Sequence, residues 1–96
     1  METWLKNSLE LVYRSCGNVK DIDYKILAFI FYEHFSDRNL SQFIGQLYGF
    51  DEMKVYHEIG SILYTEYDPA EISRLMQLLK QNGYDTWKDS DWPILP

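Results

Sequence analysis

The sequence predicts an all-α fold: a compact single-domain bundle of about five helices with an extended C-terminal tail rich in tryptophan and proline. Its 96 residues are enough for one ordinary domain and too few for two, so residues 1–96 are expected to form a single helical domain. Apolar residues make up 46% of the chain, which is ample material for a core. Apolar side chains recur at helical spacing, and capping residues or glycines separate the repeats.

The first two helices are expected over residues 3–16 and from after Asp21 to about Phe35. Thr3 can cap the first helix and Gly17 can end it. The centre of the second helix, residues 26–32, is apolar on every side, which is typical of a helix in the middle of a domain. The inner face of the first helix is formed by Leu5, Leu9, Val12 and Cys16.

The third and fourth helices are expected from about Asn39 to Tyr48 and from about Glu52 to Thr65. Asp51 can cap the fourth helix. Gly60 lies within it and should lower its stability by roughly 1 kcal/mol relative to alanine. A close contact with another helix would explain that glycine. The inner faces are formed by Leu40, Phe43, Ile44 and Leu47 in the third helix and by Val55, Ile59, Ile62 and Leu63 in the fourth.

The fifth helix has the clearest start in the sequence, because Asp68 can cap it and Pro69 suits its first turn. We expect it to end at Gly83, with an inner face formed by Ile72, Leu75, Met76 and Leu79. The remaining residues, 84–96, contain prolines and are expected to be extended. Two tryptophans are costly to leave in water, so this tail should pack on the helices or on a partner.

The composition argues against several classes of partner. The chain has 15 Asp and Glu against 9 Lys and Arg, and its formal net charge is −6. Non-specific binding to nucleic acid or to an anionic membrane needs surplus positive charge, so neither partner is expected. The N-terminus lacks the pattern of a secretory signal, and the longest apolar run, residues 26–32, is much shorter than the ~20 residues of a membrane-spanning helix. A cytoplasmic location is therefore expected.

The residue groupings typical of catalysis or metal binding are missing from the sequence. Cys16 is the single cysteine, which excludes an internal disulfide and a thiolate metal cluster. His57 and Glu58 begin like the zinc-protease pattern, but its second histidine would fall at Ser61. The glycines form no phosphate-binding loop. We therefore expect neither an enzyme, nor a cofactor, nor a metal site.

Residues 40–63 contain the spacing of a helix-turn-helix. Gly45, Gly49 and Val55 stand where that motif needs a small residue, a turn glycine and an apolar packing residue. The stretch resembles the helix-turn-helix of small bacterial repressors. Its second helix, however, carries three acids against one lysine, and carboxylates oppose binding to phosphates. A tight helical hairpin is the favoured interpretation, and a transcription regulator that uses residues 40–63 is the alternative function.

The acidity lies mainly in the second half of the chain, where residues 51–96 hold nine acids and four bases. Tyrosines and tryptophans are interleaved with these acids. Carboxylates complement a basic partner, and aromatic rings give rigid contact area. For part of this set the alternative is simpler, with acids that only solvate the surface and rings that only fill the core. The expected partner-binding residues are Asp51, Glu52, Tyr56, Glu58, Glu66, Tyr67, Asp68, Glu71, Trp87, Asp89, Asp91 and Trp92.

In size, charge, helical build and lack of catalytic groups, the chain resembles the toxin-neutralising immunity proteins of bacteria and phage-encoded inhibitors of host nucleases. The resemblance is one of profile and not of motif. It implies a binding protein that inhibits a basic protein partner, a nuclease toxin or another nucleic-acid-handling enzyme, by covering its cleft. A subunit or adaptor without an inhibitory role is a third hypothesis, and the oligomeric state is left open.

Overall fold

The computed structural model describes residues 2–89 and confirms the all-α prediction, because these residues contain helices and no strand. None of the helices within residues 2–89 is both long enough and apolar enough to pass through a membrane. The elements are α1 (Thr3–Cys16), α2 (Tyr24–Phe31), the 3-10 turn η1 (Tyr32–His34), α3 (Asp37–Tyr48), α4 (Glu52–Ile62), α5 (Pro69–Gln81) and α6 (Tyr84–Lys88).

Four of the helices begin at a side chain that accepts a hydrogen bond from a backbone N–H of the first turn. These capping side chains are Asp23 in α2, Ser36 in α3, Asp51 in α4 and Asp68 in α5. Each satisfies a donor that has no partner within its own helix. The prediction that Thr3 caps α1 was wrong, since Glu2 occupies the capping position and makes no such bond.

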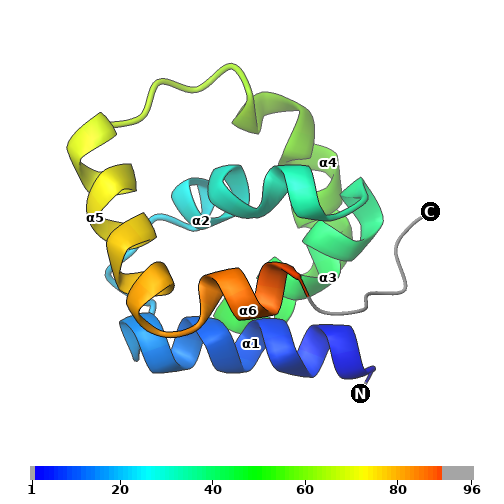
Figure 1. Ribbon diagram of the computed structural model, residues 1–96. Helices are drawn as coiled ribbons and strands as arrows, with labels where there is room; N and C mark the ends of the chain where they lie inside the picture. The colour runs from blue at the N-terminus through cyan, green and yellow to red at the C-terminus, as the bar shows by residue number, and fades with distance from the viewer. Residues whose placement is uncertain (1, 90–96) are drawn as a thin grey trace.

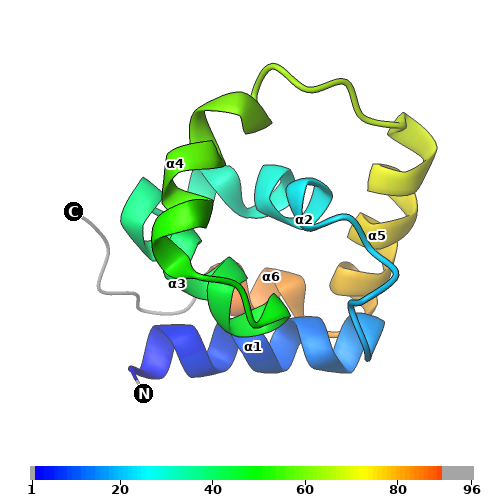
Figure 2. The same cartoon turned by 180° about the vertical axis from the view of Figure 1, so that it is seen from behind.

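The apolar helix α2 lies in the middle of the bundle, as its sequence predicts (Figures 1 and 2). Helix α2 packs against α3, α4 and α5. Helix α1 packs against α3, α5 and α6. Its buried side chains are Leu27, Ala28, Ile30 and Phe31. Phe29 is the exception: it is partly exposed, and its ring contacts Tyr67, with 4.9 Å between the ring centroids.

Trp87 belongs to a cluster of aromatic rings in the core and not to an extended tail. The expectation of an extended chain was wrong for residues 84–88, which form α6. The Trp87 ring lies 5.2 Å from that of Phe31, and its indole N–H donates to the Ser8 hydroxyl over 3.0 Å. Ser8 is fully buried on α1, so this bond joins the first and last helices of the described chain. Residues 90–96 lie outside the described part.

The glycines of α3 and α4 have different surroundings. A Cβ atom on Gly45 would lie 3.1 Å from the Phe50 carbonyl oxygen, so this glycine permits the close approach of the two helices. Gly49 ends α3 in the left-handed region, at φ 72°. Gly60 is exposed, and a Cβ there would meet no atom within 4 Å. The expected close helix contact at Gly60 is therefore absent from the described chain.

Candidate functional site

Helix α4 presents its polar and aromatic side chains to solvent because its apolar positions face inward. Val55, Ile59 and Ile62 are buried against the rest of the bundle. Asp51 accepts a hydrogen bond from the Met53 N–H over 2.9 Å, so its carboxylate serves the start of the helix. The outer face of α4 therefore begins at Glu52 and carries Tyr56, whereas Glu58, the third predicted contact residue of this helix, lies on another flank.

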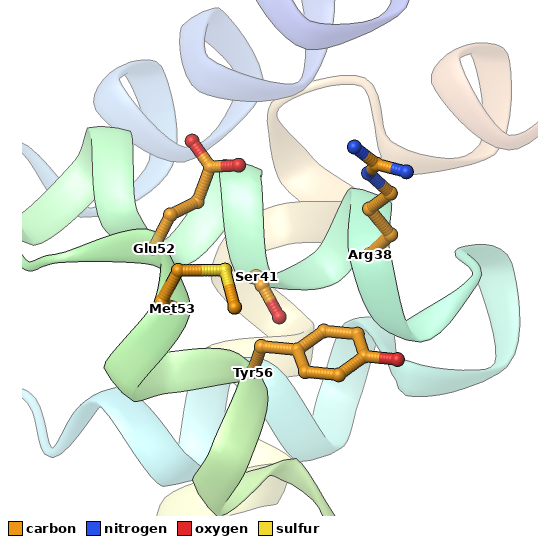
Figure 3. Close-up of a pocket in the computed structure, with 5 residues that line it drawn as sticks. All are labelled: Arg38, Ser41, Glu52, Met53 and Tyr56. Atoms are coloured by element: carbon orange, nitrogen blue, oxygen red, sulfur yellow. The ribbon is translucent and has the colours of Figure 1, made fainter.

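A groove of about 350 Å³ separates α4 from α3 (Figure 3). Glu52, Met53 and Tyr56 line its α4 side, and Arg38 and Ser41 line its α3 side. The Ser41 hydroxyl donates to the Asp37 carbonyl within α3. The charged ends of Arg38 and Glu52 make no hydrogen bond or ion pair with another described residue, so both stay available to a ligand or partner.

The opposite flank of α4 is tied to α2 through Glu58. Its carboxylate accepts a hydrogen bond from the Tyr24 hydroxyl. Burial raises the pKa of Tyr24, and the bond to Glu58 raises it further, so the hydroxyl keeps its proton and remains a donor. Glu58 is exposed, yet it is already engaged in holding α4 against α2.

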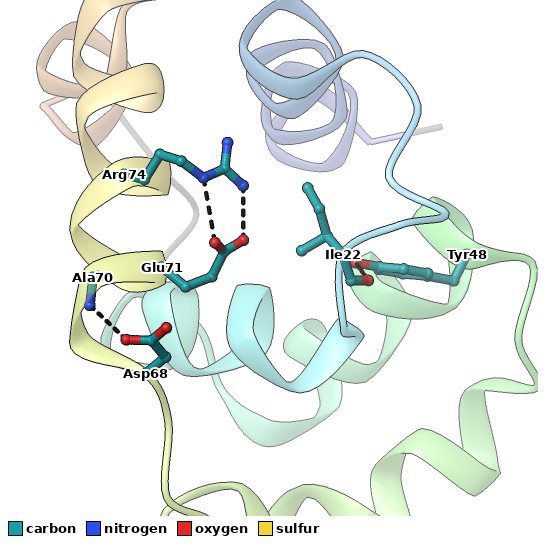
Figure 4. A network of polar contacts seen from close by, with 6 residues as sticks. All are labelled: Ile22, Tyr48, Asp68, Ala70, Glu71 and Arg74. Carbon is teal, nitrogen blue, oxygen red and sulfur yellow. Dashed lines mark hydrogen bonds and ion pairs between the residues drawn. The ribbon is translucent and has the colours of Figure 1, made fainter.

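The predicted residues around the start of α5 are mostly engaged in the fold (Figure 4). Asp68 accepts from the Ala70 N–H over 3.0 Å, and Glu71 pairs with Arg74 over 2.7 Å. The bond from Arg74 lowers the pKa of Glu71. The Tyr67 hydroxyl donates to the Ile62 carbonyl over 2.7 Å. Glu66 differs from these residues, since it is exposed and forms no bond with another residue of the described chain.

The C-terminal part of the predicted set is only partly described. Trp87 is 5% exposed and packs on the helices, which is one of the two arrangements expected for the tryptophans of this segment. Asp89 follows α6 and is exposed. Asp91 and Trp92 lie outside the described residues.

The structure also places apolar side chains on the surface of α4 that the sequence pattern did not single out. Leu63 was predicted to face inward, but α4 ends at Ile62 and Leu63 is 49% exposed. Met53 is 59% exposed and Tyr64 is 88% exposed. The helical register could have found Met53, because it lies opposite Val55 and Ile59 on the helix. We call Met53, Tyr56, His57, Gly60, Leu63 and Tyr64 the α4 strip.

The groups most often used in catalysis are not assembled in the described chain. Among residues 2–89, no three His, Cys, Asp or Glu side chains lie together so that they could hold a metal ion. His34 lies 2.7 Å from the Tyr84 hydroxyl, and its ring packs against Trp87. Cys16 is partly buried, and burial raises the pKa of its thiol, which makes it a weak nucleophile.

Comparison of the chain with family models, with curated proteins and with solved structures finds no match. The functional argument therefore depends on the surface itself. We consider the outer side of α4, where Glu52, Met53 and Tyr56 line the groove to α3 and the other residues of the α4 strip are exposed.

Proposed function

We propose that this chain is an acidic binding protein that neutralises a basic protein partner, a nuclease toxin or another nucleic-acid-handling enzyme, by covering its cleft. The observation that carries the proposal is the outer side of α4, where the unpaired Glu52 carboxylate stands next to the exposed Met53 and Tyr56. Apolar and aromatic side chains supply contact area, and a free carboxylate supplies charge complementarity.

The charge of the chain supports the same proposal. Clefts that bind nucleic acid are lined by Lys and Arg, and a protein with a net charge of −6 is attracted to them over long distances. Glu52 and Glu66 are the acids best suited to this role, because each is exposed and neither caps a helix nor pairs with a base of the described chain. Asp51, Asp68 and Glu71 already have structural roles, since the first two cap helices and Glu71 pairs with Arg74.

Charge reversal at the free acids tests this proposal. A pull-down from the source cell with the full chain should recover a partner whose active site is basic. The double variant Glu52→Lys and Glu66→Lys should weaken binding to that purified partner by at least about tenfold, which is a loss of about 1.4 kcal/mol. The matched control is Glu10→Lys on α1, also an exposed acid. Binding that is equally tight for the wild-type chain and the double variant would refute the proposal.

A transcription regulator remains the second candidate, because the turn between α3 and α4 has the tight geometry of a helix-turn-helix. The left-handed Gly49 and the 3.1 Å between a Cβ on Gly45 and the Phe50 oxygen favour this reading. The acids of α4 oppose it, since they would face phosphates. A gel shift at low salt separates the two functions: specific binding to duplex DNA would favour the regulator.

A further inference from the structure

We propose that a pocket between the start of α2 and α4 binds the guanidinium group of one arginine side chain of the partner. This inference rests on the proposed function, to which it adds a second contact on another flank of α4 and the type of residue that the partner presents there. The pocket has a volume of about 330 Å³. Its aromatic lining residues are Tyr24 and Phe50. Its charged lining residues are Asp51, Lys54 and Glu58, and we call it the Tyr24 pocket.

The aromatic rings of the Tyr24 pocket suit a cation. The rings of Tyr24 and Phe50 stand nearly at right angles, at 87°, with 5.5 Å between their centroids. Tyr48 stacks on Phe50, with 5.3 Å between the ring centroids. Although Phe50 contacts both of these rings, 46% of its surface stays exposed. The faces of aromatic rings carry partial negative charge and attract cations, above all a guanidinium, which is flat and weakly hydrated.

The two carboxylates of the pocket are each held in place through one oxygen. Asp51 Oδ1 accepts a hydrogen bond from the Met53 N–H over 2.9 Å. Glu58 Oε2 accepts one from the Tyr24 hydroxyl. Neither carboxylate forms another hydrogen bond or an ion pair with a residue of the described chain. The second oxygen of each is therefore available to a guanidinium, whose N–H donors form a planar fork that matches carboxylates.

The charges that line the pocket favour a cation over an anion. Lys54 is the only base among the described lining residues, and it forms no ion pair with Asp51 or Glu58. Two carboxylates against one ammonium leave a net negative charge, which attracts a guanidinium and repels a phosphate or a carboxylate. The volume lies near the lower end of the range for small-ligand sites, which suits a single side chain.

The test uses the full chain and the capped tripeptide acetyl-Gly-Arg-Gly-amide, whose only charge is its guanidinium. In the wild-type chain this peptide should cause saturable shifts of the backbone NMR signals of Tyr24, Phe50 and Glu58. The same peptide with citrulline, which has the shape of arginine without its charge, should cause no saturable shift. The lysine peptide should bind at least about threefold more weakly, because an ammonium is more strongly hydrated and cannot bond a carboxylate through a planar fork.

Two substitutions should move the affinity for the arginine peptide in opposite directions. Glu58→Gln removes a charge but keeps an oxygen that can accept the Tyr24 hydroxyl proton, and it should weaken binding at least about fivefold. Lys54→Gln removes the like charge and should strengthen binding at least about twofold, which a loss of folding cannot do. The matched control is Glu10→Gln, an exposed acid on α1 outside the pocket, which should leave the affinity unchanged.

The aromatic part of the proposal has its own variant. Phe50→Leu keeps an apolar side chain at the pocket but removes the ring, and it should weaken binding of the arginine peptide at least about threefold. Circular dichroism of each variant should show the helix content of the wild-type chain.

Equal affinity of the wild-type chain and Glu58→Gln for the arginine peptide would overturn the inference, and so would equal affinity for the arginine and citrulline peptides. A dimer of the wild-type chain, seen by sedimentation, that both Arg38→Gln and Glu58→Gln dissociate would overturn it as well. The exposed Arg38 of a second copy would then be the occupant of the pocket.

The purified partner separates this inference from the proposed function. If Glu52→Lys with Glu66→Lys loses the partner while Glu58→Gln keeps it, the acidic surface is upheld and the pocket contact is refuted. If Glu58→Gln loses the arginine peptide while the double variant binds the partner as tightly as the wild-type chain, the guanidinium site is upheld and the proposed function is refuted.

Discussion

Two glycines on neighbouring helices show that the surroundings of a glycine determine how its replacement changes the stability of the fold. Gly45 faces the Phe50 carbonyl oxygen across a distance that leaves little room for a side chain, whereas Gly60 faces open space. Both lie within helices, at positions where alanine would have the higher helix propensity. Gly60→Ala should therefore raise the free energy of unfolding by about 1 kcal/mol, measured by urea denaturation. Gly45→Ala should give no such gain, and an equal gain at both positions would contradict the contact between α3 and α4.

His34 makes the stability of the fold depend on pH. Its side chain is 16% exposed, and burial lowers its pKa, although Glu33 opposes and Lys88 adds to this shift. The unfolded chain therefore takes up a proton before the native chain does. Stability contributed by the neutral ring is complete above the ordinary histidine pKa of about 6.5 and is lost as the pH falls below it.

The variant His34→Gln should flatten the pH dependence of the unfolding free energy between about pH 7 and pH 5. Urea denaturation at several pH values measures the slope, and the exposed His57→Gln controls for the loss of a histidine as such. A slope that stays as steep in His34→Gln as in the wild-type chain would show that other groups cause it.

At the scale of the helix, two acids near the start of α5 differ in their structural role. Asp68 caps the helix, with the Ala70 N–H 3.0 Å from its carboxylate, while Glu66 is exposed two residues earlier without a bond in the described chain. Asp68→Ala should lower the free energy of unfolding by about 1 kcal/mol. Glu66→Ala should change it by less than about 0.5 kcal/mol, as is usual for surface positions. Thermal or urea denaturation of the two variants checks the difference.

The sequence predicts the helices themselves well and their ends less well. The bounds of α1 match the prediction, since an apolar repeat and a terminal glycine both mark them. The end of α4 does not match, because it depends on residues that follow. The Tyr67 and Thr65 hydroxyls donate to the carbonyls of Ile62 and Ser61, which the next helical turn would otherwise use. A periodic pattern contains no information about such bonds.

Helix α6 was missed for a related reason. It has only five residues, and isolated helices of that length are unstable in water. Contacts from distant parts of the chain stabilise it, above all the packing of Trp87 on Phe31 and its bond to Ser8. Sequence distance hides these contacts, so the prolines further along suggested an extended tail instead.

At the scale of the whole molecule, the first helix of the described chain packs against its last two helices, and together they cover one side of the core. α1 packs on α5 and α6, and the Arg14 guanidinium donates to the Asn82 carbonyl over 3.1 Å at the turn between those helices. Trp87→Ala should therefore lower the free energy of unfolding of the entire domain by about 3–5 kcal/mol. Far-UV and near-UV circular dichroism should report one coincident transition at a lower temperature. Separate transitions would show that α6 and α1 unfold independently of the rest.

The candidate site is also only partly predictable from the sequence. Charge asymmetry places the acids in the second half of the chain, and most of those within residues 51–89 are exposed. Which acids lack a bonding partner depends on the fold. Glu58, for example, accepts a hydrogen bond from Tyr24, which lies on α2, far away in sequence. The exposure of Leu63 likewise follows from where α4 ends, and not from its apolar character.

The distinction between acids that cap helices and acids that do not also has a consequence for how the sequence of such a protein can evolve. Glu52, Met53 and Tyr56 cap no helix, and their side chains lie outside the buried core. Under the proposed function, substitutions at these positions would alter which partner surface is recognised with little loss of stability, whereas substitution of Asp51 or Asp68 would remove the cap of α4 or α5. As a binding protein of the kind proposed, the same scaffold would therefore acquire a new specificity through a few surface replacements.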